Sequence, residues 1–116
     1  MEGEEEVTIN VLGTEYEIIH TTDRERPELK NVDGYCANYE KYILVETDLF
    51  RCDPPDLRSD KAVEERSKQI KRHEIIHAFI MESAAQHSVL DNEYCVHWIA
   101  LQFPKMLEAF RQVNAI

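Results

Sequence analysis

Alternating apolar and polar residues follow a short acidic segment at the start of the chain. Two runs, Val7–Leu12 and Thr14–His20, alternate in this way, which is typical of strands with one buried face. They meet at Gly13, and so short a connection predicts a β-hairpin. Residues 1–6, which read MEGEEE, lack this pattern and are predicted to form a disordered tail.

A second pair of strands is predicted after a polar loop that carries Pro27. These strands lie at about Tyr35–Tyr39 and Lys41–Glu46, with a tight turn around Glu40 between them. The segment Leu49–Arg58 then carries two consecutive prolines, which exclude a regular strand or helix there.

Helical spacing of apolar residues replaces the alternation in the second half of the chain. Ser59 or Asp60 is a suitable N-cap for a helix that continues to about Glu82. The second half of this helix, Ile75–Met81, is apolar nearly all round. This end is therefore predicted to be buried on most faces.

A second helix is predicted to begin at a cap formed by Asp91 or Asn92, and Pro104 is expected to kink it or to start a new segment. Its apolar residues at helical spacing are Val96, Ile99, Ala100, Phe103, Leu107 and Phe110. Strands thus precede helices along the chain. This order predicts one α+β domain over residues 1–116, with a small antiparallel or mixed sheet packed on two helices.

Composition narrows the partners and the compartment. The formal net charge is -10, and such a surface repels phosphates, so no nucleic-acid partner is expected, although imitation of DNA by an acidic protein remains open. Three cysteines without CxxC spacing argue against a disulfide framework. The acidic N-terminus does not resemble a signal peptide, and no apolar run is long enough to cross a membrane, so a cytoplasmic protein is expected.

The sequence HEIIH within the first helix is the strongest chemical signal of the chain. His73 and His77 are four residues apart and share one face of a helix, so both imidazoles can bind one ion. Glu74 lies slightly to one side, where it can reach a water molecule on that ion. This is the HExxH arrangement of metallopeptidases, which predicts one Zn2+ per chain and Glu74 as general base.

A catalytic zinc site needs a third protein ligand and one open position. The downstream candidates are His87, Glu93, Cys95 and His97. Glu93 is preferred, because it begins the second helix and lies four residues before His97, on the same face. His87 is predicted to be a solvated loop residue, and Cys95, like Cys36, a small core residue.

Three segments carry a resemblance to a known group of enzymes: GYCANYEKYILVE, RHEIIHAFIMES and NEYCVHWIALQFPKMLEAF. HEIIH followed by a helical NE segment resembles the gluzincin-type zinc metallopeptidases, which use two histidines and a glutamate. The segments together are similar to small phage and prophage proteins of Gram-positive bacteria, and in layout to the peptidase domain of the ImmA/IrrE group. The resemblance implies a zincin-like fold, peptidase activity and Glu93 as third ligand.

One position departs from the pattern of that family. His97 stands where the family carries an aspartate that supports the first histidine. His97 is therefore expected to hydrogen-bond a ligand, to stabilise an oxyanion, or to bind the zinc itself. Tyr39 and Tyr94 are further candidates for the oxyanion role.

Three functions are compatible with the sequence. The first is a zinc peptidase acting on a protein or peptide, bound in extended form along an edge strand, either Tyr35–Tyr39 or Lys41–Glu46. The resemblance makes a repressor-like regulator one candidate substrate. The second is a zinc-stabilised acidic binding or inhibitor protein without catalysis. The third is a structural zinc site closed by four protein ligands, which would require His97 or Cys95 in addition to Glu93. No oligomeric state is predicted.

Overall fold

The structure is a computed structural model that describes residues 5–50 and 59–116. It is an α+β fold with a four-stranded mixed sheet and two long helices, as the order of elements in the sequence predicted. The elements are β1 (Glu5–Val11), β2 (Thr14–Thr21), the 3-10 turn η1 (Pro27–Leu29), β3 (Gly34–Ala37), β4 (Tyr42–Glu46), α1 (Asp60–Glu82) and α2 (Glu93–Gln112).

The predicted hairpin is confirmed as β1 and β2, which pair antiparallel on either side of Gly13. Gly13 has a φ of 94°, a conformation that glycine adopts without the steric penalty of a side chain. β1 begins at Glu5, two residues earlier than predicted, because Glu5 and Glu6 still pair with His20 and Ile19 of β2. The remainder of the predicted tail, residues 1–4, lies outside the described residues.

Strand order decides which edge of the sheet is open. The order is β1-β2-β4-β3, with β4 parallel to β2 and antiparallel to β3. β4 therefore has hydrogen-bonded neighbours on both sides, and the prediction that Lys41–Glu46 is a candidate edge strand is wrong. The edge on this side of the sheet is β3, which covers the first part of the other candidate, Tyr35–Tyr39.

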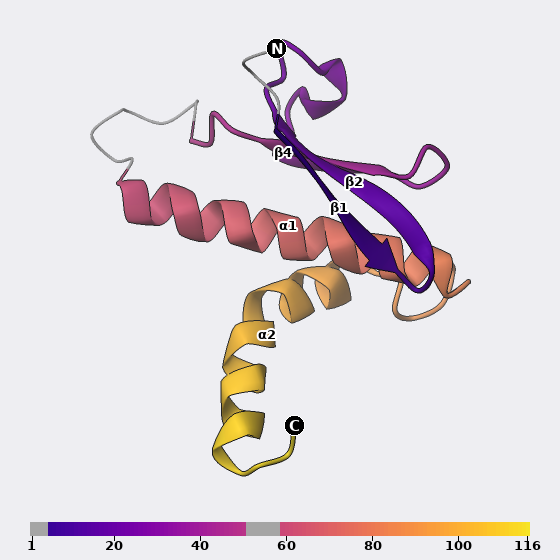
Figure 1. The fold of residues 1–116 in the computed structure, drawn as a ribbon, viewed down its shortest axis with the longest axis vertical. Coiled ribbons are helices and arrows are strands. Elements are labelled where there is room, and N and C mark those ends of the chain that lie inside the picture. Colours follow the sequence, from indigo (N-terminus) through magenta and orange to yellow (C-terminus); the bar gives the residue numbers. More distant parts are fainter. Residues whose placement is uncertain (1–4, 51–58) are drawn as a thin grey trace.

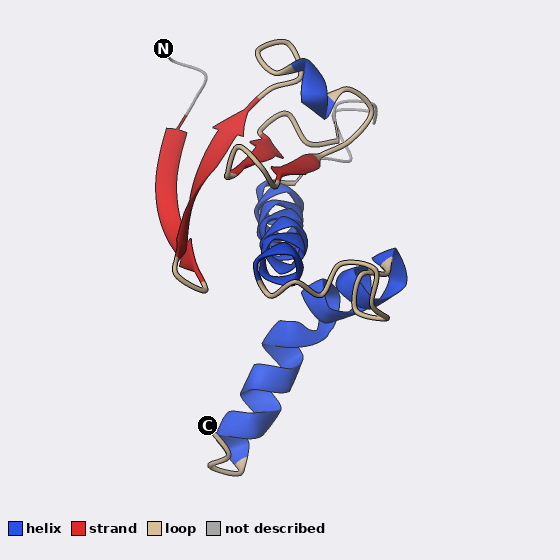
Figure 2. Ribbon diagram, turned by 90° about the vertical axis from the view of Figure 1, so that its right-hand side faces the viewer, coloured by secondary structure: helices blue, strands red, loops and turns tan. Residues whose placement is uncertain are grey.

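α1 lies between the sheet and α2 (Figures 1 and 2). Its side facing the strands carries Ile70 and Ala78, which belong to one buried cluster with residues of β1, β2 and β4. The members of that cluster from the strands are Val11, Tyr16, Ile18, Ile43 and Val45. This packing fixes the helix against the middle of the sheet and leaves its opposite side to α2.

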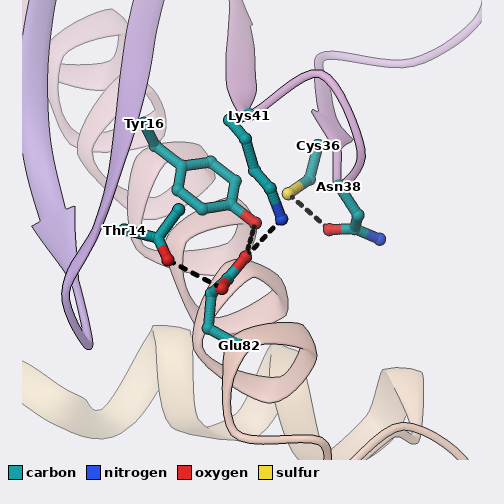
Figure 3. A network of polar contacts seen from close by, with 6 residues as sticks. All are labelled: Thr14, Tyr16, Cys36, Asn38, Lys41 and Glu82. Atoms are coloured by element: carbon teal, nitrogen blue, oxygen red, sulfur yellow. Dashed lines mark hydrogen bonds and ion pairs between the residues drawn. The ribbon is translucent and has the colours of Figure 1, made fainter.

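A polar network holds the C-terminal end of α1 (Figure 3). The carboxylate of Glu82 accepts hydrogen bonds from the hydroxyls of Thr14 and Tyr16, at 2.9 and 2.7 Å, and pairs with the Lys41 ammonium at 2.7 Å. At the other end of the helix, the Ser59 side chain accepts a hydrogen bond from the amide of Ala62, so Ser59 rather than Asp60 is the N-cap of the two that the sequence offered. Both ends of α1 are thereby tied down.

α2 is a single bent helix with Pro104 inside it (Figures 1 and 2). Because proline has no amide hydrogen, the carbonyl of Ala100, four residues earlier, loses its helical donor. The guanidinium of Arg72, on α1, donates to that carbonyl instead. The Arg72 side chain thus provides a hydrogen-bond donor for the carbonyl that Pro104 leaves unpaired in the helix, and it joins the two helices.

Two predictions about burial are wrong. Within Ile75–Met81 only Ala78 and Ile80 are buried, and Phe79 is 40% exposed, because the sheet and α2 cover two sides of α1 but not its whole circumference. Cys95 is exposed rather than in the core, since it lies on the side of α2 that faces away from α1. In the described part of the chain, neither helix combines the length and the apolarity that crossing a membrane requires.

Candidate metal centre

The two histidines of HEIIH lie on one face of α1 and point to a common place. His73 and His77 are one helical turn apart, and their Nε2 atoms are 3.3 Å from each other. Their side chains are 20% and 24% exposed, so the pair lies at the surface of the domain but is largely covered. Helix geometry alone brings these two donors together, which is why the motif could be recognised in the sequence.

Glu93 brings a carboxylate to the same place from α2. It is the first residue of that helix, and the helix starts there because the side chain of Asn92 caps it by accepting from the amide of Tyr94. One carboxylate oxygen of Glu93 is 2.7 Å from His77 Nε2, and the other is 3.3 Å from His73 Nε2. Among the described residues, His73, His77 and Glu93 form a group that can hold a metal ion.

The spacing of the two histidine donors fits a tetrahedral ion, and Glu93 lies within reach of the same ion. Metal–ligand bonds of about 2.0–2.1 Å at tetrahedral angles place neighbouring ligand atoms about 3.3–3.4 Å apart. The Nε2 atoms of His73 and His77 are 3.3 Å apart, and Glu93 approaches each of them with a different carboxylate oxygen, at 3.3 Å from His73 and 2.7 Å from His77. This carboxylate is 71% exposed and can adjust by rotation. Three protein donors leave a fourth position for water or substrate.

The surroundings of His73 favour its neutral imidazole, the form that binds metals. Burial lowers the pKa of His73, and the neighbouring rings of His77 and His97 lower it further, whereas the carboxylate of Glu93 opposes them. His73 therefore keeps a lone pair available at neutral pH.

Glu74 is a partly buried carboxyl group beside the donors. Burial raises its pKa to about 7, and the negative charge of Glu93 adds to the rise. A side chain with such a pKa can accept and release a proton near neutral pH, which is what a general base requires.

The position of the Glu74 side chain is shaped by Gly34, at the start of β3. A Cβ atom on Gly34 would stand 2.8 Å from Glu74 Oε2 and 2.7 Å from Ile70 Cγ2, closer than any ordinary contact.

A groove of about 1050 Å³ runs along α1 and ends at this group. One wall is a continuous face of the helix, formed by Arg66, Gln69, Ile70, His73, Glu74 and His77. The other wall is β3 with the segment before it, and the ion pair between Arg66 and Asp33, at 3.3 Å, joins the two walls. The groove therefore lies between the metal-binding helix and the open edge of the sheet.

Cys36 also lines the groove. Burial and the nearby Glu74 carboxyl raise the pKa of its thiol to about 12, and the thiol donates to Asn38 Oδ1 at 3.1 Å. A protonated thiol is neither a nucleophile nor a metal ligand, so Cys36 is part of the wall.

The remaining candidate residues are distributed unevenly around the site. His97 lies next to it, with its ring centroid 6.4 Å from that of His73, and its donors do not join the converging group. Tyr94 and His97 line a second, smaller depression with His73 and Glu93. Tyr39 is 87% exposed in the turn before β4 and lines neither cavity. His87 is exposed in the loop between the helices, as predicted.

Two residues that position the site were not identified in the sequence. Gly34 follows a polar loop in the sequence and opens β3 in the structure, and a glycine in a strand is a known sign of close backbone approach. The sequence pattern marks Glu82 only as the end of a helix, because its partners are 41 to 68 residues away in the sequence.

Comparison of the chain with protein-family models, curated proteins and solved structures gives no match. The assignment of the site therefore depends on its own geometry.

Proposed function

We propose that this protein is a zinc-dependent peptidase of zincin-like fold. The observation that carries the proposal is the convergence of His73, His77 and Glu93 on one place, with the carboxyl of Glu74 outside the donor set but next to it. Two nitrogen ligands and one oxygen ligand suit zinc, and an open fourth position is typical of catalytic rather than structural sites. The arrangement is also the one that the resemblance to gluzincin-type peptidases implies.

A bound zinc ion supplies Lewis-acid chemistry, since it polarises a carbonyl group and makes a water molecule acidic enough to ionise near neutral pH. The side chains of the protein do the rest of the work. Glu74 accepts the proton of the attacking water and delivers it to the nitrogen of the leaving amine. His97 and Tyr94, on the first turns of α2, line a depression with His73 and Glu93 and are the candidate donors of a hydrogen bond to the oxyanion.

The substrate would occupy the groove as an extended peptide. β3 has an open edge, and it can pair with one more strand through main-chain hydrogen bonds. The groove between β3 and α1 leads from Arg66 to the metal centre and has room for several residues of a peptide. A protein or peptide substrate fits this shape, and the resemblance to the ImmA/IrrE group makes a repressor-like regulator one candidate.

A second candidate is a zinc-stabilised binding protein without catalysis. The net charge of -10 favours it, because an acidic surface attracts basic partners and can imitate nucleic acid. The two proposals share the metal and differ in the role of Glu74. A carboxyl group that binds no metal and is held beside an open metal position has a purpose in hydrolysis and none in binding.

Replacing Glu74 by glutamine separates these proposals. The purified protein and the variant would be compared for zinc content by mass spectrometry and for cleavage of a peptide library and of basic repressor-type proteins. The variant is expected to retain one zinc per chain and to lose activity by about 10²–10⁴-fold, the usual contribution of a general base. Glu65→Gln makes the same change at an exposed position of α1 and is expected to leave both properties unchanged.

Other outcomes would favour other functions. Loss of zinc in Glu74→Gln would mean that Glu74 is a ligand and that the site is closed and structural. A wild-type protein that cleaves nothing in the presence of zinc, but binds a basic protein tightly, would be a binding protein.

A further inference from the structure

α2 carries a stripe of apolar side chains that extends beyond the part of the helix that packs against the rest of the domain. Val96, Ile99, Phe103, Met106 and Phe110 follow one another at alternating intervals of three and four residues. This spacing keeps them on one side of the helix, as in the seam between two paired helices. Val113 continues the same spacing just beyond the helix end.

Only the first part of this stripe is covered by the domain. Val96 is buried where α2 packs against α1, as is the neighbouring Ala100. Phe103 and Phe110 are 45% and 41% exposed, and Val113 is 73% exposed. Figures 1 and 2 show the reason, since the half of α2 beyond the bend extends away from the sheet and from α1.

A projecting segment of this length needs a partner to be stable. Isolated helices shorter than about 12–15 residues are marginal in water, and most helix stability in proteins comes from burial of an apolar face. The part of α2 that follows Pro104 has only 8 residues, from 105 to 112. The apolar stripe is therefore the surface through which this segment gains its stability.

The charges around the stripe indicate what can cover it. The positions that flank it are uncharged, namely Gln102, Leu107 and Ala109. Lys105, Glu108 and Arg111 lie on the remaining circumference of the helix. Residues 103–116 thus carry two positive charges and one negative charge, in a chain with a net charge of -10.

We propose that the apolar stripe of α2 beyond Pro104 binds the same segment of a second copy of this chain. Two copies of so acidic a protein repel each other over most of their surface, and this segment is a place where they can approach without like-charge repulsion. A helix face that meets its own copy forms a two-fold symmetric contact, the commonest type among soluble oligomers. The small side chain of Ala109 beside the stripe allows the helices to approach closely.

This pairing does not involve the groove. Glu93 is at the opposite end of α2 from the exposed part of the stripe, so the residues of the contact are separate from those of the metal centre. The proposal holds whether or not the protein is a peptidase, and it can be tested without a substrate.

Light scattering during size-exclusion chromatography tests the proposal directly. The wild-type protein is expected to reach twice the mass of the 13.6 kDa chain as its concentration rises. Phe110→Glu places a charge in the centre of the contact and next to its own copy, and it is expected to weaken the dimer at least about tenfold. Met106→Lys introduces a positive charge and is also expected to weaken the dimer. Weakening by both variants would show that the effect comes from a charge in the contact and not from an increase in the negative charge of the protein.

The matched control is Gln112→Glu, which adds the same charge on the opposite side of the helix and should leave the dimer intact. Far-UV circular dichroism and thermal unfolding would establish that each variant is folded. A wild-type protein that stays monomeric at the highest attainable concentration would overturn the proposal, as would dimers that both stripe variants form as readily as wild type. Binding of a monomer to neutral lipid vesicles through the stripe would overturn it too, in favour of a membrane surface.

Discussion

Gly34→Ala is the substitution that tests the architecture of the site most directly. The new methyl carbon would stand 2.7 Å from Ile70 Cγ2 and 2.8 Å from Glu74 Oε2, whereas ordinary contact begins at 3.4 Å. The new carbon would therefore be closer than ordinary contact by about 0.7 Å at Ile70 and by about 0.6 Å at Glu74. Ile70 is in the core and can move little, so relief of that contact requires a shift of the β3 backbone, while the flexible side chain of Glu74 is displaced from its place beside the donors.

Two magnitudes follow from this displacement. Overpacking of this kind usually costs about 1–3 kcal/mol of unfolding free energy. A misplacement of about 1 Å in a catalytic group can reduce the rate about 10²-fold, so kcat/KM for peptide hydrolysis should fall by roughly that factor. Zinc affinity should change little, because Glu74 is not one of the converging donors.

Gly13→Ala is the matched control. Nothing lies within 4 Å of a Cβ at this position, but its φ of 94° is unfavourable for alanine and should cost about 1–2 kcal/mol. The two variants are therefore expected to lose similar stability in urea unfolding, while only Gly34→Ala loses activity. If Gly34→Ala matched wild type in both stability and rate, the close approach of β3 to Glu74 would be refuted. The stability measurement tests this contact even without a substrate.

Two further predictions concern Glu93 and Glu82. Removal of a group that supports a metal ligand typically weakens zinc binding about 10–100-fold, so His97→Ala should stay within that range, whereas Glu93→Ala should exceed it. Competition with a chromophoric chelator measures both affinities. A larger loss in His97→Ala than in Glu93→Ala would make His97 the third ligand. The hydrogen bond from Lys41, followed by those from Tyr16 and Thr14, lowers the pKa of Glu82 from 4.5 to about 2. Because its folded-state pKa is depressed, its contribution to stability is complete above about pH 4.5 and is lost as the pH falls toward 2. Urea unfolding of wild type and Glu82→Gln over this range should therefore show a difference that shrinks with acidity, and a difference independent of pH would contradict the assignment.

The parts of this protein that the sequence predicted are those that local geometry determines. The spacing of His73 and His77 fixes their mutual direction on any helix, and the caps Ser59 and Asn92 mark where the helices begin. Glu93 was identified because it starts a helix and lies four residues before another polar residue. Each of these inferences needs only a few neighbouring residues.

The parts that escaped prediction depend on contacts between distant segments. β4 pairs with β2 in parallel, although the chain between them also forms β3, and no local pattern marks such a strand as interior. Gly34 matters because of what it faces across the groove, and Glu82 because three donors from two other segments converge on it. Sequence patterns report which face of an element is buried but not which element covers it.

The metal centre combines two histidines from one turn of α1 with a glutamate from α2, and the placement of α2 determines whether these ligands meet. His73 and His77 are held by α1 alone, but Glu93 reaches them only if α2 crosses α1 at the right point. Arg72, directly before His73, donates to the carbonyl of Ala100 on α2. That carbonyl is free because Pro104 removes its helical donor. The same proline bends the helix and turns its later apolar residues away from the domain. Pro104 therefore has two effects. It frees the carbonyl whose hydrogen bond with Arg72 aligns Glu93, and it exposes the stripe that we assign to a second copy.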